Sequence, residues 1–275
     1  MRLVLLMVTS APEVAGFAIA SGVDRVFVDL ETRGKADRQE GRGMYLSSAQ
    51  LEDVGRIRQV VPKGGLLVRI NGPWAGSVDE VEASIAAGAD FVMVPMFRTR
   101  DEIERVCEAT DGRAVVVPLF ETAEAAAIAQ EVMSVEGVGE AYVGLNDLAL
   151  SFGEDFLFRA MLDRRFDRLC EALSRSGKPF GIGGIGRIGT GRVSAELLLG
   201  EYLRRGASRV ILSRAFREGA DGIEQIRQVV DLGAEVQRVR AVAAGLGART
   251  ASEGHLHWDM LREEIDRASR DSFKG

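Results

Sequence analysis

Lysine, histidine and cysteine are all scarce in this chain. Its 275 residues include four lysines, two histidines and two cysteines. Two isolated thiols cannot form a disulfide framework, which fits a reducing compartment, and we expect the protein to be cytoplasmic. No apolar run is long enough to span a bilayer, so no membrane partner is expected. The run Leu3–Val8 is too short for a signal segment and is expected to form a first buried strand.

The few lysines narrow the chemistry that the chain can perform. An enzyme that forms a Schiff base needs a desolvated lysine inside its fold. Lys63 and Lys178 precede expected strands, Lys274 lies in the tail, and Lys35 lies in a glycine-rich loop. None of these positions suits a buried amine, so Schiff-base chemistry is not expected.

The remaining composition is that of an ordinary globular protein. Hydrophobic residues make up 46% of the chain, charged residues 28%, and the net charge is −6. A negative balance gives no reason to expect nucleic acid or an anionic membrane surface as a partner. The length suits one α/β barrel domain.

Short apolar runs alternate along the chain with longer segments of helical periodicity. The expected strands are Leu3–Val8, Arg25–Leu30, Gly65–Ile70, Phe91–Pro95, Ala114–Glu121, Ala141–Gly144, Pro179–Ile182 and Arg209–Ser213. The expected helices are Pro12–Ser21, Ser48–Val61, Ser77–Ala87, Thr99–Thr110, Thr122–Met133, Phe156–Ser176, Ser194–Arg205, Gly222–Ala244 and Ala251–Ser272. Eight such units predict a parallel sheet that closes into a (β/α)₈ barrel, the TIM barrel. We assign residues 1–250 to this barrel and 251–275 to an extra C-terminal helix.

Polar side chains follow four of the expected strands, at the point where each strand ends. They are Asp29, Glu31, Arg69, Asn71, Glu121 and Asp147. Each one alone is compatible with a structural ion pair, but the carboxyl ends of barrel strands share one rim, where barrel enzymes have their active sites. The long charged loop Thr32–Ser47 belongs to the same rim and is expected to be functional.

Glu121 and Asp147 form the most informative pair on this rim. If their strands are neighbours, the strand axes lie roughly 5 Å apart, so both carboxylates can reach one hard cation while water and substrate fill its other positions. No histidine or cysteine accompanies them. An all-oxygen ligand set favours Mg²⁺ or Mn²⁺ over zinc.

Several motifs on this rim occur together in a known family. They are Val28-Asp29-Leu30-Glu31, Val68-Arg69-Ile70-Asn71, Phe120-Glu121-Thr122 and Gly144-Leu145-Asn146-Asp147-Leu148. In these motifs and their order, residues 3 to 217 resemble the HpcH/HpaI aldolase and citrate lyase β-subunit family. The resemblance implies a metal-dependent (β/α)₈ lyase that forms or cleaves a carbon–carbon bond next to an enolate. Its substrates would be a 2-oxo acid of pyruvate type and an aldehyde, or an acyl-CoA.

The resemblance also implies roles for individual residues. Glu121 and Asp147 would bind the divalent metal, and Arg69 would hold the keto oxygen and the enolate oxygen that develops from it. Backbone N–H groups of Gly144, Leu145, Asn146 and Asp147 would bind the substrate carboxylate. Glu31 would contact the water on the metal, and Asp29 would support the loop after strand two.

One position departs from the family pattern. Pyruvate aldolases of this family carry a proton-transferring histidine directly after the glutamate of strand two, where this chain has Thr32. The only histidines, His255 and His257, lie in the last helix, and two residues apart they do not share a helical face. Proton transfer would then use metal-bound water or a loop group such as Arg33, Lys35 or Asp37.

Two other functions stay open at this point. The chain is compatible with an acyl-CoA lyase or thioesterase of the citrate lyase β-subunit type, which shares the strand-two and strand-three motifs. It is also compatible with a catalytically silent barrel that serves as a scaffold, which the missing histidine favours and the intact acid pair opposes.

A glycine-rich run follows the seventh expected strand, from Gly181 to Arg192. Its backbone amides, around Gly184, and the Arg187 side chain could bind a phosphoryl group of a phosphorylated substrate. The alternative is a loop whose glycines only turn the chain. The C-terminal helix has no partner strand. In relatives such helices pack on a neighbouring subunit, so we expect a homo-oligomer.

Overall fold

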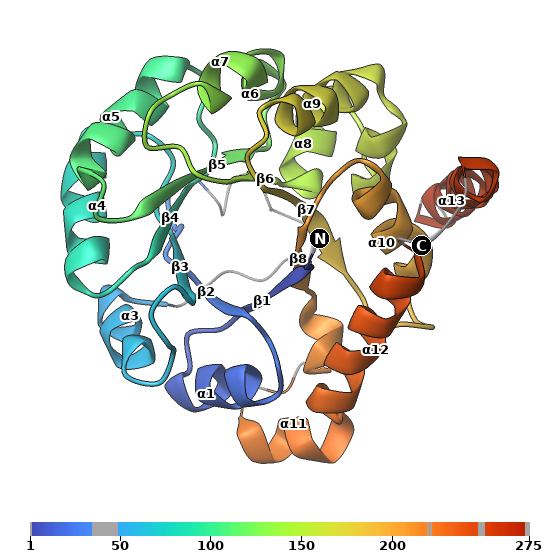
Figure 1. Ribbon diagram of the computed structural model, residues 1–275, viewed down its shortest axis with the longest axis horizontal. Coiled ribbons are helices and arrows are strands. Elements are labelled where there is room, and N and C mark those ends of the chain that lie inside the picture. The colour runs from blue at the N-terminus through green and yellow to red at the C-terminus, as the bar shows by residue number, and fades with distance from the viewer. Residues whose placement is uncertain (1, 35–48, 219, 221, 247–250, 273–275) are drawn as a thin grey trace.

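Eight parallel strands close into a barrel in chain order, and the helices lie outside it (Figure 1). The computed structural model describes residues 2–34, 49–218, 220, 222–246 and 251–272, with the side chains of 251–255 and 272 excepted. The predicted (β/α)₈ barrel is therefore confirmed. Most of the loop 32–47, with Lys35 and Asp37, lies outside the described residues.

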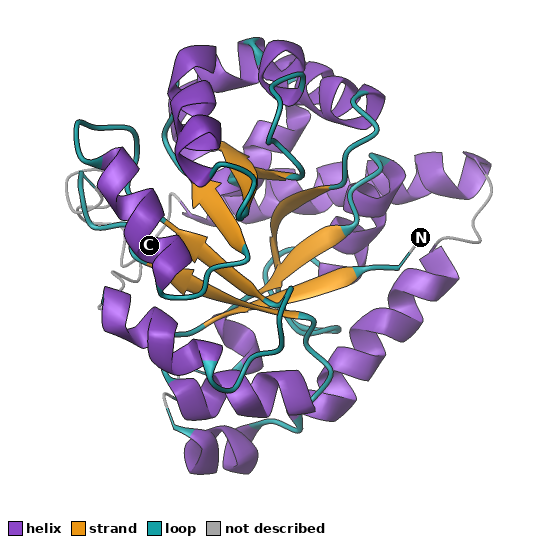
Figure 2. Ribbon diagram, turned by 60° about the vertical axis from the view of Figure 1, so that its left-hand side comes forward, coloured by secondary structure: helices purple, strands orange, loops and turns teal. Residues whose placement is uncertain are grey.

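Strand and helix order follows the predicted alternation. The strands lie at the centre of the molecule and the helices surround them (Figure 2). The strands are β1 (Val4–Val8), β2 (Arg25–Asp29), β3 (Leu66–Arg69), β4 (Phe91–Val94), β5 (Val115–Phe120), β6 (Ala141–Val143), β7 (Phe180–Ile185) and β8 (Arg209–Leu212). The described helices are α1 (Pro12–Ala20), α3 (Leu51–Arg58), α4 (Ser77–Ala86), α5 (Arg100–Thr110), α6 (Ala123–Ala127), α7 (Ala129–Met133), α8 (Leu145–Phe152), η1 (Leu157–Leu162), α9 (Arg164–Arg175), α10 (Ala195–Arg204), η2 (Arg214–Phe216), α11 (Ile223–Val229), α12 (Leu232–Leu246) and α13 (Ala251–Ser272).

Two local predictions differ from the structure. Helix α8 begins directly after β6, where the sequence suggested only a loop, and it ends at the left-handed Gly153. Strand β7 continues to Ile185, so half of the glycine-rich run belongs to a strand. Three long predicted helices are also divided, for example at Ile128, whose backbone is not helical.

The barrel interior is filled by the inward-facing side chains of the strands. Leu6, Phe27 and Leu67 point inward and pack in one cluster, while Leu5 and Met7 point outward into the larger cluster under the helices. This alternation follows the two-residue period of a strand. Because the interior is packed, chemistry is confined to the rims of the barrel.

A buried ion triad closes the end of the barrel at which the strands begin. Glu140 accepts hydrogen bonds from Arg25 at 2.6 and 2.9 Å and from Arg209 at 2.8 Å. The Arg25 guanidinium also lies 3.8 Å from the centre of the Phe91 ring. Burial disfavours the carboxylate, but the two arginines outweigh it and hold the pKa of Glu140 below its ordinary value.

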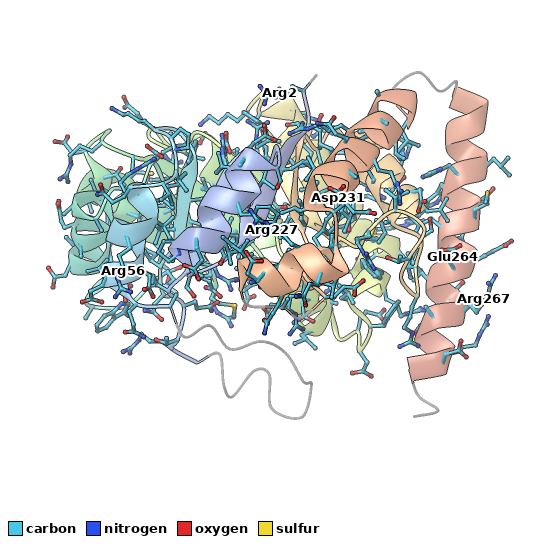
Figure 3. The ribbon with its side chains drawn as sticks, turned by 90° about the horizontal axis from the view of Figure 1, so that it is seen from below. Arg2, Arg56, Arg227, Asp231, Glu264 and Arg267 are labelled. Atoms are coloured by element: carbon cyan, nitrogen blue, oxygen red, sulfur yellow. The ribbon has the colours of Figure 1, made fainter. Side chains whose placement is uncertain are left out.

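Helix α13 packs against α10 and η1 of its own chain. Leu261 and Ile265 are fully buried there, and His257 Nε2 lies 2.9 Å from the backbone oxygen of Leu197. Glu264, labelled in Figure 3, accepts a hydrogen bond of 2.7 Å from the amide of the N-cap residue of α10. His257 therefore contributes to the packing of α13 against α10. Packing on a second subunit stays a prediction.

Within the described ranges, no helix combines the length and the apolar character that crossing a membrane requires.

We predict that the variant Glu140→Gln destabilises the barrel by about 3 kcal/mol at pH 7, because it leaves two partly buried arginines without a charge partner. The folded-state pKa of Glu140 lies below its ordinary value of 4.5. This stabilisation is therefore complete above that pH and is lost as the pH falls through the folded-state pKa. Urea unfolding at pH 7 and below pH 4.5 measures both effects.

The control is Glu82→Gln, which removes an equivalent ion pair with Arg113 at the exposed surface. It should change the unfolding midpoint far less. Equal midpoints for Glu140→Gln and the parent protein at pH 7 would contradict the structural role of the triad.

Candidate active site

A cavity of about 320 Å³ opens at the carboxyl ends of the strands. It brings together most of the residues predicted from the sequence. Those lining it include Asp29, Arg69, Glu121, Gly144, Leu145, Asn146, Asp147 and Gly184. Glu31 lies behind this set, with its Oε2 atom 3.3 Å from Arg69 Nη2. Arg214, which follows β8, also lines the cavity.

Glu121 is held in place from the exit of β4. It directly follows β5, and its Oε1 atom accepts a hydrogen bond of 3.0 Å from the backbone N–H of Met96. Met96 has a left-handed backbone with φ of 53°, an arrangement that non-glycine residues adopt at a cost. The Thr122 hydroxyl donates to the backbone oxygen of Phe97 at 3.0 Å and so fixes the next residue.

The exit of β6 lies directly beside the Glu121 carboxylate. The Gly144 amide donates to the backbone oxygen of Phe120 at 3.1 Å, which extends the β5–β6 pairing to the rim. A Cβ atom at Gly144 would lie 2.6 Å from Glu121 Oε2. Helix α8 then begins at Leu145, and Asp147 lies in its first turn. The two acids thus belong to adjacent strand exits, as the sequence predicts.

The electrostatics at Glu121 are unfavourable for a bare carboxylate. Burial, opposed by the charge of Arg69 and reinforced by the carboxylates of Asp147 and Glu31, raises the pKa of Glu121 to about 8. A divalent cation beside these carboxylates would remove the repulsion and favour the ionised form.

Arg69 is the central cation of the rim. Its Nε and Nη2 atoms donate to the two carboxylate oxygens of Asp29, each at 2.8 Å. Burial would lower the pKa of Arg69, but the Asp29 hydrogen bonds and the charges of Asp29, Glu31 and Glu121 raise it. The guanidinium is therefore a permanent charge, held in one orientation by a two-point contact.

These residues fit a hard divalent cation that binds only two protein ligands. Over the described part of the chain, no group of three or more histidine, cysteine, aspartate or glutamate side chains is placed to hold a metal ion alone. Glu121 and Asp147 would therefore supply two oxygens, and substrate and water the rest, which is how Mg²⁺ is usually bound.

The glycine-rich run has a structural explanation in its first half. A Cβ at Gly181 would lie 2.2 Å from the Tyr142 ring, and Gly183 has a left-handed backbone with φ of 47°. The Tyr142 hydroxyl donates to the backbone oxygen of Gly183 at 2.8 Å. Gly181 thus leaves room for Tyr142, which lines the cavity and which sequence reasoning missed.

The arginines of this run lie apart from the acids. Arg187 forms an ion pair with Glu218. It is not among the described residues that line the cavity. Arg192 donates to the backbone oxygen of Ala268 in α13 at 2.8 Å. Of the predicted anion site, Gly183 and Gly184 line the rim cavity, whereas the side chains of Arg187 and Arg192 form contacts elsewhere.

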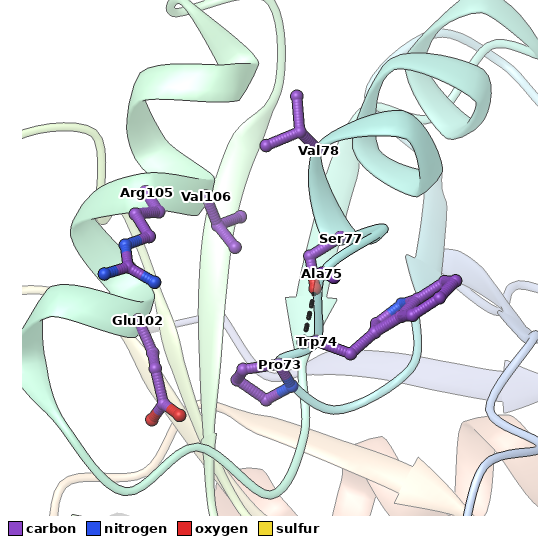
Figure 4. A pocket seen from close by; sticks show the side chains of 8 residues that line it. All are labelled: Pro73, Trp74, Ala75, Ser77, Val78, Glu102, Arg105 and Val106. Carbon is purple, nitrogen blue, oxygen red and sulfur yellow. Dashed lines mark hydrogen bonds between the residues drawn. The ribbon is translucent and has the colours of Figure 1, made fainter.

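A second cavity, of about 280 Å³, is separate from the rim cavity and its acids. Trp74, Val78, Glu102 and Arg105 are among its lining residues, which come from the loop after β3 and from α4 and α5 (Figure 4). The Trp74 amide donates to Ser77 Oγ at 2.9 Å. Trp74 therefore lines this outer cavity, and the Arg33 guanidinium lies 4.2 Å from the centre of its ring.

Comparison with known proteins places this architecture among lyases. The model of the HpcH/HpaI aldolase/citrate lyase family matches residues 2–160, more than half of the chain. No curated protein matches. Similar solved structures include an HpcH/HpaI aldolase from Desulfitobacterium hafniense DCB-2, with 16% identity, coverage of 84% of this chain and 95% of that one, and a TM-score of 0.59.

Two further structures share the fold. A family protein from Burkholderia cenocepacia J2315 has 15% identity and a TM-score of 0.61, and the match covers 90% of this chain and 95% of that one. The citrate lyase beta subunit from M. tuberculosis, complexed with oxaloacetate and magnesium, has 17% identity and a TM-score of 0.59, over 88% and 96% of the two chains.

We predict that Gly144→Ala weakens Mg²⁺ or Mn²⁺ binding about tenfold, although it removes no carboxylate. The added methyl group would collide with Glu121 Oε2 and displace the carboxylate. The φ of −90° at position 144 is open to alanine, so the backbone should not change. Calorimetric titration with each metal measures the effect.

The matched control is Gly55→Ala, because a Cβ at Gly55 in α3 meets nothing within 4 Å. An unchanged affinity in Gly144→Ala would show that Glu121 does not bind the metal in this orientation.

Proposed function

The chain belongs to the HpcH/HpaI aldolase/citrate lyase family, and we propose that it is a divalent-metal-dependent class II lyase. It would form or cleave a 2-oxo acid through a pyruvate-type enolate. The observation that carries this proposal is the meeting of Glu121, Asp147 and Arg69 in one rim cavity. A relative of the same fold is complexed with oxaloacetate, a 2-oxo acid, and magnesium.

The charges of the rim suit the enolate chemistry. Cleavage of the bond between the carbons α and β to the keto group leaves an enolate, whose negative charge lies largely on the keto oxygen. Mg²⁺ or Mn²⁺, held by Glu121 and Asp147, would supply a Lewis acid at that oxygen. Arg69 would donate to the same oxygen, and because Asp29 already fixes the guanidinium, little reorganisation is needed as the charge develops.

The start of α8 suits the substrate carboxylate. The first N–H groups of a helix have no acceptor within the helix and favour an anion. Those of Leu145 to Asp147 lie at the cavity. The Asn146 Nδ2 atom is buried and, among the described residues, has no hydrogen-bond acceptor. A substrate carboxylate at this point would satisfy the backbone and the side-chain donors together.

Transfer of the aldol proton would require a group other than residue 32. Thr32 stands at the position of the family histidine, and its hydroxyl donates to Asn71 Oδ1 at 3.4 Å. Enolate formation itself can be tested without an aldehyde, because the methyl hydrogens of pyruvate exchange with solvent deuterium when the enolate forms.

We predict metal-dependent exchange of deuterium into the pyruvate methyl group, measured by NMR with Mg²⁺ or Mn²⁺ and then with a chelator. The variants Glu121→Gln and Asp147→Asn should lower the rate about a hundredfold or more, because they remove metal ligands. Arg69→Lys should also lose about a hundredfold, since the two-point guanidinium contact is lost.

The matched control is Glu124→Gln. This glutamate lies three residues after Glu121 but pairs with Arg98 at the surface. Wild-type rates in Glu121→Gln would refute the proposal. No exchange in a protein that binds the metal would favour the CoA thioester chemistry of the citrate lyase branch, and no metal binding would favour the scaffold.

A further inference from the structure

Asn71, at the exit of β3, connects two parts of the rim. Its Oδ1 atom accepts hydrogen bonds from the backbone amides of Thr32 at 2.9 Å and Arg33 at 2.8 Å. Its Nδ2 atom donates to Glu80 of α4, and its backbone amide donates to Glu80 Oε2 at 3.3 Å. Asn71 is only 7% exposed. The side chain thus joins the chain leaving β2 to α4.

The chemistry of the partners fixes the orientation of this amide. An ionised glutamate only accepts hydrogen bonds, so the NH₂ group of Asn71 must face Glu80. The two backbone N–H groups only donate, so the oxygen must face Thr32 and Arg33. A flipped amide would lose all of these contacts, and Glu80 therefore determines which way Asn71 points.

The segment that Asn71 holds directly follows the acids that orient Arg69. Asp29 accepts hydrogen bonds from the Arg69 guanidinium and, at 3.2 Å, from the backbone amide of Glu31. Glu31 Oε2 lies 3.3 Å from Arg69 Nη2. The next two residues are the ones bound to Asn71. Leu30 and Glu31 keep their own backbone hydrogen bonds, so releasing the next two residues would free the chain directly after Glu31 and loosen the hold on that residue.

We propose that Asn71 and Glu80 are positioning residues, which fix the chain after β2 so that Asp29 and Glu31 hold Arg69 at the substrate oxygen. This inference rests on the proposed function. It goes beyond that function by assigning a role to two residues that are not proposed metal ligands. Neither residue is among the described residues that line the rim cavity.

A stabilising role alone does not account for this arrangement. Thr32 and Arg33 are exposed, so water can replace Asn71 at their amides with little loss of folding free energy. The β2–β3 pairing from Val26 to Asp29 lies below the contact and does not depend on it. What water cannot supply is a fixed position, and small misplacement of a catalytic group is costly.

The experiment exchanges the chemical groups of the pair. In N71D, a carboxylate faces the Glu80 carboxylate. The two negative charges should repel each other and disrupt the contact between residues 71 and 80. In the double variant N71D/E80Q, the carboxylate at position 71 accepts from the same backbone amides, and the amide at position 80 donates to it. All of these hydrogen bonds can then form again, with donor and acceptor reversed only between the two side chains.

Two readouts are measured on the full chain with Mn²⁺ or Mg²⁺. The first is deuterium exchange into pyruvate, with kcat and KM determined separately. The second is amide hydrogen exchange at Thr32 and Arg33, which needs no substrate. We expect N71D to lower kcat/KM about tenfold or more, mainly in kcat, and to lose amide protection. The double variant should recover both to within about threefold.

The matched control is Ser77→Ala, which removes a different hydrogen bond from the same loop, the one drawn in Figure 4. It should leave both readouts unchanged. Wild-type kinetics in N71D, or no recovery in N71D/E80Q, would overturn the proposal. If the parent protein does not exchange pyruvate, the proposed function fails, whereas amide protection still tests the Asn71 contact by itself.

Discussion

Closure of the parallel sheet is the constraint on which the whole site depends. Once eight strands pair in chain order, the exits of β2, β3, β5 and β6 must share one rim. Residues far apart in the sequence, such as Asp29 and Asp147, then line one cavity. The packed interior, with Leu6 and Phe27 among its side chains, provides the rigid support. The rim groups are therefore positioned by the fold, and local contacts such as Met96 to Glu121 only refine them.

Charged groups are balanced differently at the two ends of the barrel. At the end where the strands begin, Glu140 lies between two arginines, and its pKa lies below the ordinary value. At the rim, Arg69 is shared among several acids, and the pKa of Glu121 is about 8. The first arrangement is complete without a ligand and contributes to stability. The second has an excess of negative charge, which a bound cation would balance. The difference in charge therefore distinguishes a structural end from the end at which we propose the active site.

The sequence allowed the barrel and most of the cavity to be predicted, because strand-helix alternation and polar strand exits depend on local pattern. Glu121, Asp147 and Arg69 do meet. The contributions of Met96 and Tyr142 could not be predicted, since one is a backbone amide in a left-handed residue and the other depends on glycines across the sheet. Arg187 was expected beside the substrate from its glycine-rich surroundings, yet it pairs with Glu218. The number of glycines did not reveal which neighbours they accommodate.

Thr32 shows how one substitution can separate two parts of a reaction. Stabilising an enolate requires positive charge at one oxygen, and the rim cavity brings Arg69 together with Glu121 and Asp147, the metal ligands that we propose. Moving the proton of an aldol hydroxyl requires a group that titrates, and threonine does not. The Thr32 amide and hydroxyl both face Asn71, so this position serves the geometry of the rim. Under the proposed function, enolate formation from pyruvate does not involve the aldol proton, whereas cleavage of an aldol does, and that proton would move through a group other than residue 32.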